Sequence, residues 1–208
     1  MQQLLTGKKR LPGFSGEWTV VPLKKLLKER KTYSVKGKEY PHVTLSNEGI
    51  YPKAERYDRE HLVKSENKEY KITHYGDICY NPANLKFGAI CINFFGDAIF
   101  SPIYVTFEVC ETANLIFLGE LMMSTNFVNA VRKYEEGTVY ERMAVKPDDL
   151  LLYKVRFPSL PEQTAIAEIL STADKEIELL QKDIEQEKLK KKSLMQLLLT
   201  GIVRVKDV

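Results

Sequence analysis

The chain has 208 residues, of which 44% are hydrophobic and 28% are charged, and its formal net charge is +3. This composition is sufficient for a buried core and excludes wholesale disorder, while the mildly basic charge permits a nucleic-acid partner without requiring one. No stretch approaches 18 consecutive apolar residues, and the charges of the first ten residues follow the apolar ones, which argues against a membrane span and a signal peptide.

The chain begins and ends with copies of one segment. Residues 1–10 (MQQLLTGKKR) align without gaps on residues 195–204 (MQLLLTGIVR), with seven identical positions at an offset of 194. A chance similarity between two leucine-rich helix ends is the alternative. We interpret the match as one period of a larger repeat, which starts with the last turns of a helix whose complete copy lies at the other end. A single period leaves surface uncovered, so we expect self-association.

We expect residues 15–157 to form one α+β domain, preceded by a helix end and linker over residues 1–14. Short runs rich in β-branched and aromatic residues, separated by Gly, Asn and Pro, predict strands. These runs cover residues 18–23, 40–45, 70–73, 78–80, 88–92, 104–109 and 150–157. Residues 114–133 carry apolar side chains at three- and four-residue intervals, which predicts helix.

The three cysteines, Cys79, Cys91 and Cys110, lie within the strand-like sequence. Their odd number and apolar surroundings predict buried free thiols in a reducing cytoplasm. No two cysteines have the spacing of zinc ligands and the histidines are isolated from one another, so we expect no metal site.

A long helix is predicted within the C-terminal region, residues 158–208. Pro161 suits a first helical turn, and neither glycine nor further proline occurs before Gly201. Such a helix of about 39 residues would be roughly 58 Å long. Its apolar residues follow a heptad pattern, interrupted by Glu187 and Lys191, and form a seam that we predict to be a dimer interface. The seam consists of Ile166, Leu170, Ala173, Ile177, Leu180, Ile184, Leu194 and Leu198.

Charge is segregated along this helix. Residues 162–187 hold eight acidic and two basic side chains, whereas residues 188–192 add four lysines and no acid. The distribution suits the helix dipole. It also suits an antiparallel pair of helices, in which each acidic half lies beside the basic half of its partner. We favour this pairing, because parallel helices would place like charges together.

Several segments resemble one protein family. Residues 160–177 (LPEQTAIAEILSTADKEI) resemble the conserved-region helix of type I restriction-modification specificity subunits, and residues 194–201 (LMQLLLTG) resemble the end of that helix. Residues 76–90 (GDICYNPANLKFGAI) and 101–107 (SPIYVTF) resemble one class of their target-recognition domains. Together these motifs extend the resemblance over nearly the whole chain.

The resemblance implies a non-catalytic DNA-binding chain. Full subunits of the family carry two recognition domains and two antiparallel helices, whereas this sequence has one of each and resembles a half-subunit, either natural or excised. Two DNA methyltransferase (modification) subunits would dock on it, and a restriction/translocase subunit could join them. S-adenosylmethionine and ATP would belong to those subunits, so we expect no cofactor in this chain.

Sequence-specific DNA binding needs cations for phosphates and amide or guanidinium groups for base edges. For each candidate, a solvated or loop-stabilising role is the alternative, and Asn81 before Pro82 could simply cap a turn. The candidates are Lys36, Lys38, Asn47, Lys53, Arg56, Tyr57, Arg59 and Lys64 in one segment, Asn81, Asn84 and Lys86 in a loop between apolar strands, and Arg142 in a second loop.

No pattern in the sequence predicts catalysis. Residues 81–84 (NPAN) are similar to the Asn-Pro-Pro-aromatic motif of adenine methyltransferases, but they lack the aromatic residue that stacks on a flipped base. No glycine-rich phosphate-binding loop occurs. The acidic run at residues 185–188 is more simply explained as helix surface than as a nuclease site.

We therefore expect an α+β target-recognition domain followed by one long helix that pairs antiparallel with a second copy. Two identical recognition domains would then bind an interrupted double-stranded DNA site with inverted halves. The alternative is a coiled-coil scaffold for protein interactions that does not recognise DNA.

Overall fold

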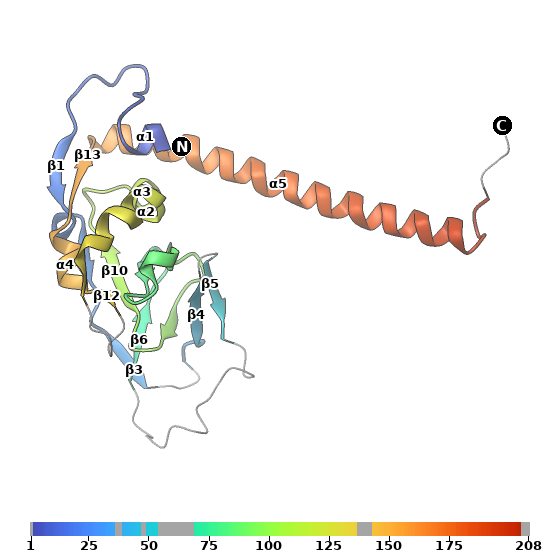
Figure 1. The fold of residues 1–208 in the computed structure, drawn as a ribbon, viewed down its shortest axis with the longest axis horizontal. Helices are drawn as coiled ribbons and strands as arrows, with labels where there is room; N and C mark the ends of the chain where they lie inside the picture. The colour runs from blue at the N-terminus through green and yellow to red at the C-terminus, as the bar shows by residue number, and fades with distance from the viewer. Residues whose placement is uncertain (1, 36–38, 47–48, 54–68, 137–142, 205–208) are drawn as a thin grey trace. The chain divides into compact units, whose positions relative to one another are not determined.

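The computed structural model describes residues 2–35, 39–46, 49–53, 69–136 and 143–204 (Figure 1). The chain divides into two units, Met1–Ala167 and Glu168–Val208. The first unit combines small antiparallel sheets with short helices, which confirms the predicted α+β class, and the second is helical. Within the described ranges, no helix has the length and apolar character needed to cross a membrane.

Two antiparallel sheets form the centre of the first unit. The four-stranded sheet has the order β2 (Leu27–Glu29), β10 (Val105–Val109), β7 (Ile78–Tyr80) and β8 (Ile90–Ile92), and the three-stranded sheet has the order β3 (Tyr33–Val35), β6 (Glu69–Thr73) and β9 (Ala98–Phe100). Strands β7 and β8 are buried along their whole length, which explains why their apolar sequence does not alternate with polar residues.

Three strand pairs accompany these sheets in the described residues. They are β1 (Thr19–Pro22) with β13 (Lys154–Phe157), β4 (Val43–Ser46) with β5 (Gly49–Pro52), and β11 (Glu135–Glu136) with β12 (Ala144–Val145). In the first pair Thr19 lies opposite Phe157, so the two sequence ends of the predicted domain meet in one antiparallel ribbon (Figure 1).

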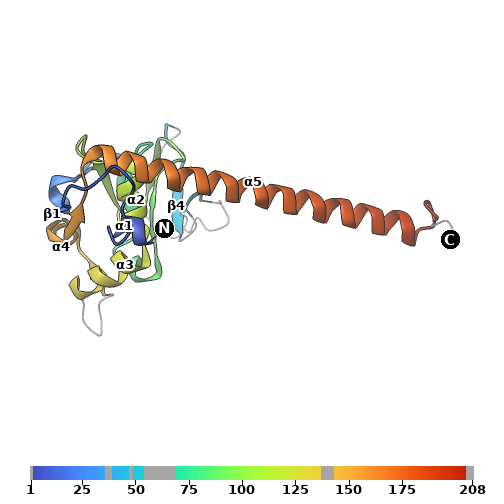
Figure 2. The same cartoon turned by 90° about the horizontal axis from the view of Figure 1, so that it is seen from above.

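The helices of the described residues are mostly short. They are α1 (Gln2–Leu5), η1 (Leu23–Lys25), η4 (Leu85–Phe87), α2 (Leu115–Met123), α3 (Thr125–Val131), η5 (Arg132–Tyr134), α4 (Pro147–Leu152) and α5 (Leu160–Leu199). Helix α1 packs beside α2, as both views show (Figures 1 and 2). The 40 residues of α5 confirm the prediction of a single long helix.

Aromatic side chains pack within the four-stranded sheet and between α2 and the β1–β13 ribbon. Tyr80 of β7 stacks on Phe107 of β10, with ring centroids 5.8 Å apart. Phe117 of α2 meets Trp18 and Phe157 edge-on, at 6.0 Å and 5.4 Å between centroids. Buried aromatic pairs of this kind contribute about 0.5–1.5 kcal/mol beyond the burial of their area.

The helical segment predicted over residues 114–133 consists of two helices, α2 and α3, which meet at Ser124. The backbone of Ser124 is extended, with ψ at 141°, and its Oγ accepts a hydrogen bond from the Phe127 backbone N–H at 3.3 Å. Ser124 is therefore the N-cap of α3. A side-chain cap of this type ends one helix and starts the next without interrupting the apolar periodicity.

The predicted strand over residues 150–157 begins too early. Residues 147–152 form α4, with Pro147 in its first turn and Asp148 and Asp149 beside it. Proline suits a first turn and carboxylates are stabilised at a helix N-terminus. Only Lys154–Phe157 is extended, and its side chains alternate between exposed and buried.

The structure describes all three cysteines as free thiols, but they are not equally buried. Cys79 and Cys91 are buried cross-strand neighbours in β7 and β8, as predicted, whereas Cys110 is only half-buried. Burial raises the pKa of Cys91 to about 12 and raises the pKa of Cys79 well above its ordinary value. Both thiols are therefore neutral and unreactive at physiological pH.

Candidate nucleic-acid interface

The loop between β7 and β8 carries three of the candidate residues. Asn81 is 6% exposed, and its Oδ1 accepts a hydrogen bond from the Ala83 backbone N–H at 3.1 Å. Its backbone N–H donates to the Ala89 carbonyl at 2.9 Å, and its carbonyl accepts from the Asn84 N–H at 3.1 Å. The Asn81 side chain thus stabilises the turn, which is the alternative that the sequence left open, and a base contact by Asn81 stays a prediction.

The outer part of this loop presents groups suited to nucleic acid. Asn84 is exposed and makes no side-chain cap to η4, while Phe87 is 70% exposed. The Lys86 Nζ lies 5.3 Å from the centroid of the Phe87 ring. An amide, a cation and an aromatic ring can respectively contact a base edge, a phosphate and a base face.

The structure places the β11–β12 pair next to this loop. The Val145 backbone N–H donates to the Pro82 carbonyl at 3.2 Å, and the Tyr80 hydroxyl donates to the Val145 carbonyl at 3.0 Å. Burial raises the pKa of Tyr80, so its hydroxyl is a permanent donor. The loop of residues 81–89 and strand β12 are therefore held together, whereas the second loop that the sequence singled out, residues 137–142, lies outside the described residues.

Further basic residues lie around these strands, and the sequence analysis missed them. Arg132 and Lys133 are exposed in η5, and the Lys133 Nζ lies 5.1 Å and 5.5 Å from the ring centroids of Tyr134 and Tyr153. Lys146, directly after β12, is exposed and pairs with Glu136 at 2.7 Å. The sequence signal that could have found Arg132 and Lys133 is their position as two adjacent basic residues at the end of an apolar helix.

The β4–β5 hairpin positions one more candidate. Lys53 follows β5, is half-buried, and donates its backbone N–H to the His42 carbonyl at 2.8 Å. Both strands of the hairpin pack against β8, the strand that directly follows the loop of Asn84 and Lys86. The other candidates lie outside the described residues: Lys36, Lys38, Asn47, Arg56, Tyr57, Arg59, Lys64 and Arg142.

The start of α5 is fixed to the first unit by two buried polar residues of the Pro-Glu-Gln segment. The Glu162 carboxylate accepts hydrogen bonds from Arg10 at 2.6 Å and 2.9 Å and from the Trp18 indole N–H at 3.2 Å. Gln163 accepts from the Asn114 backbone N–H at 2.7 Å and donates to the Pro158 carbonyl at 3.0 Å. These bonds satisfy polar atoms that would be costly to bury alone.

The predicted seam of α5 is exposed only from Ala173 onward. Ile166 and Leu170 are 1% and 3% exposed within the single chain, and their part in a dimer interface stays a prediction. Ala173 and the five seam residues after it are exposed: Ile177, Leu180, Ile184, Leu194 and Leu198. Their pairing with another helix stays a prediction.

The described residues include no group of three or more His, Cys, Asp or Glu side chains that could hold a metal ion. The buried carboxylate of Asp77 has a structural role. Asp77 accepts two hydrogen bonds from Arg30, at 2.9 Å and 3.0 Å, and one from the His74 backbone N–H at 2.8 Å. Asp77 in turn raises the pKa of Arg30, which therefore stays charged.

A family model for the type I restriction modification DNA specificity domain matches residues 16–189. The chain therefore belongs to this family. The match covers the first unit from β1 onward and most of α5. This agrees with the resemblance found in the separate sequence motifs.

Two curated relatives come from Methanocaldococcus jannaschii. The chain is 40% identical over 92 residues to the type I restriction enzyme MjaVIII specificity subunit, covering 44% of this chain and 21% of that protein. It is 44% identical over 70 residues to the putative type I restriction enzyme MjaX specificity subunit, covering 34% of this chain and 16% of that protein. The matches thus span about a fifth of these relatives' length.

Solved structures share the fold. The HsdS subunit from Thermoanaerobacter tengcongensis has a TM-score of 0.52 at 15% identity, covering 87% of this chain and 44% of that one. The S subunit of a type-I restriction-modification system from M. genitalium has a TM-score of 0.57 at 19% identity, covering 90% of this chain and 47% of that one. This chain corresponds to about half of each.

Proposed function

We propose that this chain recognises one half of an interrupted DNA site as a non-catalytic specificity half-subunit of a type I restriction-modification system. The observation that carries the proposal is the family match over residues 16–189. The loop of Asn84, Lys86 and Phe87, together with the neighbouring β11–β12 pair, is the surface that we propose for DNA contact. Its exposed amide and aromatic ring and its half-buried lysine suit base edges, base stacking and phosphates.

Two copies pair through antiparallel α5 helices in this proposal. The exposed apolar seam from Ala173 to Leu198 supports it, because apolar side chains left in water favour association. The segregation of acidic and basic residues along α5 supports the antiparallel direction. A helix of 40 residues spans about 60 Å, which limits the separation of the two half-sites to about 18 base pairs.

The paired chains direct DNA methyltransferase subunits to the site, and a restriction/translocase subunit joins the same assembly. This chain contributes sequence recognition, and its partners contribute the chemistry with S-adenosylmethionine and ATP. We place the assembly in the cytoplasm, where its DNA substrate and both cofactors are found.

The test is DNA binding by the chain together with its modification subunit, measured against salt concentration and followed by selection of bound sequences from a random pool. We expect the logarithm of the binding constant to fall linearly with the logarithm of salt concentration, and the selected consensus to hold two inverted identical halves. Selection that returns no consensus, or binding that is insensitive to salt, would contradict DNA recognition.

A protein-interaction scaffold is the second candidate, and the exposed seam of α5 is the observation that favours it. The scaffold predicts that the chain assembles with its modification subunit while the complex shows no sequence preference on DNA. The same selection experiment therefore separates the two candidates.

A further inference from the structure

The sequence repeat at the two ends of the chain is also a repeat of local structure. Thr6 and Thr200 donate both backbone N–H and hydroxyl to the carbonyl four residues earlier, at 3.1 Å and 2.8 Å for Thr6 and at 3.0 Å and 2.7 Å for Thr200. Gly7 and Gly201 follow in the left-handed region, with φ of 69° and 72°. Both segments are therefore helix ends with the same glycine cap.

The later bonds of the cap agree as well. The Gly7 N–H donates to the Leu4 carbonyl at 3.3 Å, and the Gly201 N–H donates to the Leu198 carbonyl at 3.2 Å. Two positions further on, the N–H of residue 9 and that of residue 203 each reach back six residues, at 3.0 Å and 3.2 Å. The backbones of the two copies thus follow the same course around the cap, so the side chains that are identical in both copies occupy equivalent positions.

Their surroundings differ completely. Leu5 is 2% exposed and packs with α1 against α2, whereas its counterpart Leu199 is 81% exposed. The position of a Cβ on Gly7 would lie 3.2 Å from the Trp18 ring, whereas the equivalent position on Gly201 has nothing within 4 Å. The first copy is docked and the second is not.

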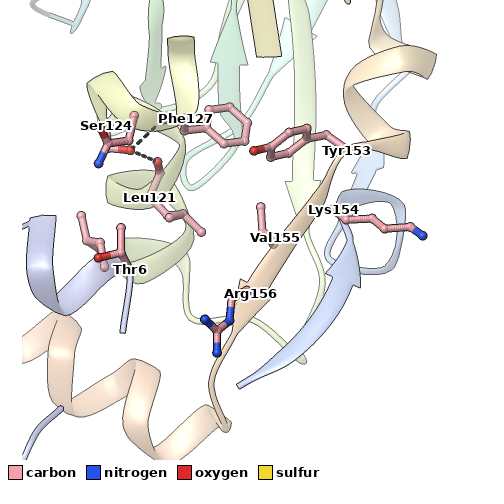
Figure 3. A pocket seen from close by; sticks show the side chains of 10 residues that line it. Thr6, Leu121, Ser124, Phe127, Tyr153, Lys154, Val155 and Arg156 are labelled. Atoms are coloured by element: carbon pink, nitrogen blue, oxygen red, sulfur yellow. Dashed lines mark hydrogen bonds between the residues drawn. The ribbon is translucent and has the colours of Figure 1, made fainter. Parts of the chain in front are cut away.

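The docked copy covers a defined surface, which we call the helix-end site: Trp18, Leu121 and Glu162. Leu5 and Leu121 line one pocket of about 250 Å³, which lies between α1, α2, α3 and β13 (Figure 3). Arg10, at the far end of the segment, holds the buried Glu162 carboxylate with two hydrogen bonds and lies 5.8 Å from the centroid of the Trp18 ring. The site therefore selects a leucine, a close glycine turn and an arginine.

Residues 195–204 carry the same three groups in the same order, namely Leu199, Gly201 and Arg204. We propose that the helix-end site of one copy binds residues 195–204 of a second copy, and that residues 2–10 are a competing occupant from the same chain. The inference rests on the proposed self-association and adds its contact at the helix end. A two-fold axis makes the contact reciprocal, so each pair of chains has two such contacts.

The competition has a measurable consequence. Displacing residues 2–10 from the helix-end site frees it for a second copy and strengthens self-association. Damaging residues 195–204 weakens self-association. Matched substitutions make the comparison, because Leu5→Asp and Leu199→Asp change the same position of the repeat. Leu189→Asp is the control, because Leu189 is an exposed leucine of α5 that lies outside both the repeat and the seam.

The measurement is the dimer dissociation constant from sedimentation equilibrium. We expect Leu199→Asp to raise it by about tenfold or more, because two buried leucines are lost per dimer, and Leu189→Asp to leave it within about twofold. We expect Leu5→Asp to lower the dissociation constant, provided that near-ultraviolet circular dichroism shows a folded domain. An unchanged dissociation constant for Leu199→Asp would overturn the proposal.

Contact mapping keeps the proposal testable if Leu5→Asp fails to fold. A photo-activated benzophenone amino acid replaces Thr200, which lies outside the seam and whose counterpart Thr6 lines the pocket, in a mixture of ¹⁴N- and ¹⁵N-labelled chains. We expect mixed-isotope cross-links to α2 and to β13, the walls of the pocket in Figure 3. Cross-links confined to other surfaces, or to the same chain, would overturn the proposal.

Failure of this inference is distinguishable from failure of the proposed function. If helix pairing is correct and the helix-end contact is not, Leu180→Asp still dissociates the dimer while residue 200 cross-links elsewhere. If DNA recognition is wrong, the selection experiment returns no consensus whatever the cross-links show.

Discussion

At the N-terminal end of α5, the Glu162 carboxylate joins two parts of the chain that are distant in sequence. It is 2% exposed and accepts hydrogen bonds from Arg10 and from Trp18, which lie before the first strand. The sequence indicated only that an acidic residue suits a first helical turn. The structure shows that this carboxylate also holds the N-terminal segment against the domain. Among the described residues, Glu162 is the acidic side chain that forms an ion pair with Arg10.

We predict that Glu162→Gln lowers the free energy of unfolding by about 2–3 kcal/mol, because it removes the negative charge opposite a partly buried guanidinium. Urea unfolding followed by fluorescence of Trp18 measures the change. Glu168→Gln is the control, since Glu168 is exposed on the same helix, and we expect it to change stability by less than about 0.5 kcal/mol. Equal effects of the two substitutions would show that the buried pair has no special role.

Lys86 is the described candidate best placed to contact a DNA phosphate. We predict that Lys86→Ala weakens DNA binding similarly for all sequences and reduces the slope of the salt dependence by about one. Asn84→Ala should instead reduce discrimination between bases while leaving that slope unchanged. Mobility shifts over a salt series measure both, with Lys175→Ala on α5 as the control. If the salt dependence of DNA binding has the same slope for Lys86→Ala as for the wild-type chain, Lys86 does not contact a phosphate and the proposed interface is wrong at this loop.

At the scale of the elements, α2 depends on a close approach to β8. A Cβ on Gly119 would lie well inside van der Waals contact with Cγ1 and Cδ1 of Ile92. Glycine is a poor helix former, so local propensity argues for alanine here by about 1 kcal/mol. Tertiary packing decides otherwise, because there is no room for a methyl group between the helix and the sheet.

We predict that Gly119→Ala lowers the free energy of unfolding by about 1–2 kcal/mol, since overpacking outweighs the gain in helix propensity. Gly16→Ala is the matched control, because nothing lies within 4 Å of its Cβ position, and should be nearly neutral. The double variant Gly119→Ala/Ile92→Ala should be less unstable than the sum of the single changes. Strict additivity in urea unfolding would exclude the steric explanation.

For the whole molecule, the exposed seam of α5 leads to a prediction about assembly. Leu180 is 55% exposed in the single chain and occupies a seam position, whereas its neighbour Gln181 does not. We predict that Leu180→Asp raises the dimer dissociation constant by at least about 100-fold, because two buried leucines are replaced by charges. Gln181→Asp should have little effect. Sedimentation velocity measures both, and a dimer that survives Leu180→Asp would contradict pairing through the seam.

Local signals predicted some elements well and others poorly. The long helix was predicted nearly to the residue, because its start at Pro161 and its end at Gly201 are marked by residues with strong positional preferences. Strands β2, β3, β5 and β9, of three or four residues each, were not predicted, whereas the equally short β7 and β8 were predicted from their continuous apolar runs. The break at Ser124 was missed because the apolar pattern continues across the serine cap. Helix α4 was missed because its apolar residues read as a strand, although the preceding Lys-Pro-Asp-Asp sequence is typical of a helix start.

The candidate interface was predictable in kind but not in arrangement. The amide and the cation of residues 84 and 86 could be recognised in a loop between apolar strands. Their proximity to β12 depends on the hydrogen bonds from Tyr80 and Val145, which no spacing in the sequence indicates. Likewise, the structural role of Asn81 became clear only when its side chain was seen to accept from a backbone N–H.

By itself the sequence determined the family, the α+β class, the long helix and the repeat at the two ends, because each is encoded by residues that are close in sequence or by direct identity. Only the tertiary structure decided which parts of these patterns are buried. Ile166 and Leu170 share the heptad pattern of Leu180 but are covered by the chain itself, and Leu5 is buried where its copy Leu199 is exposed. Burial depends on contacts between distant segments, which a local pattern cannot specify.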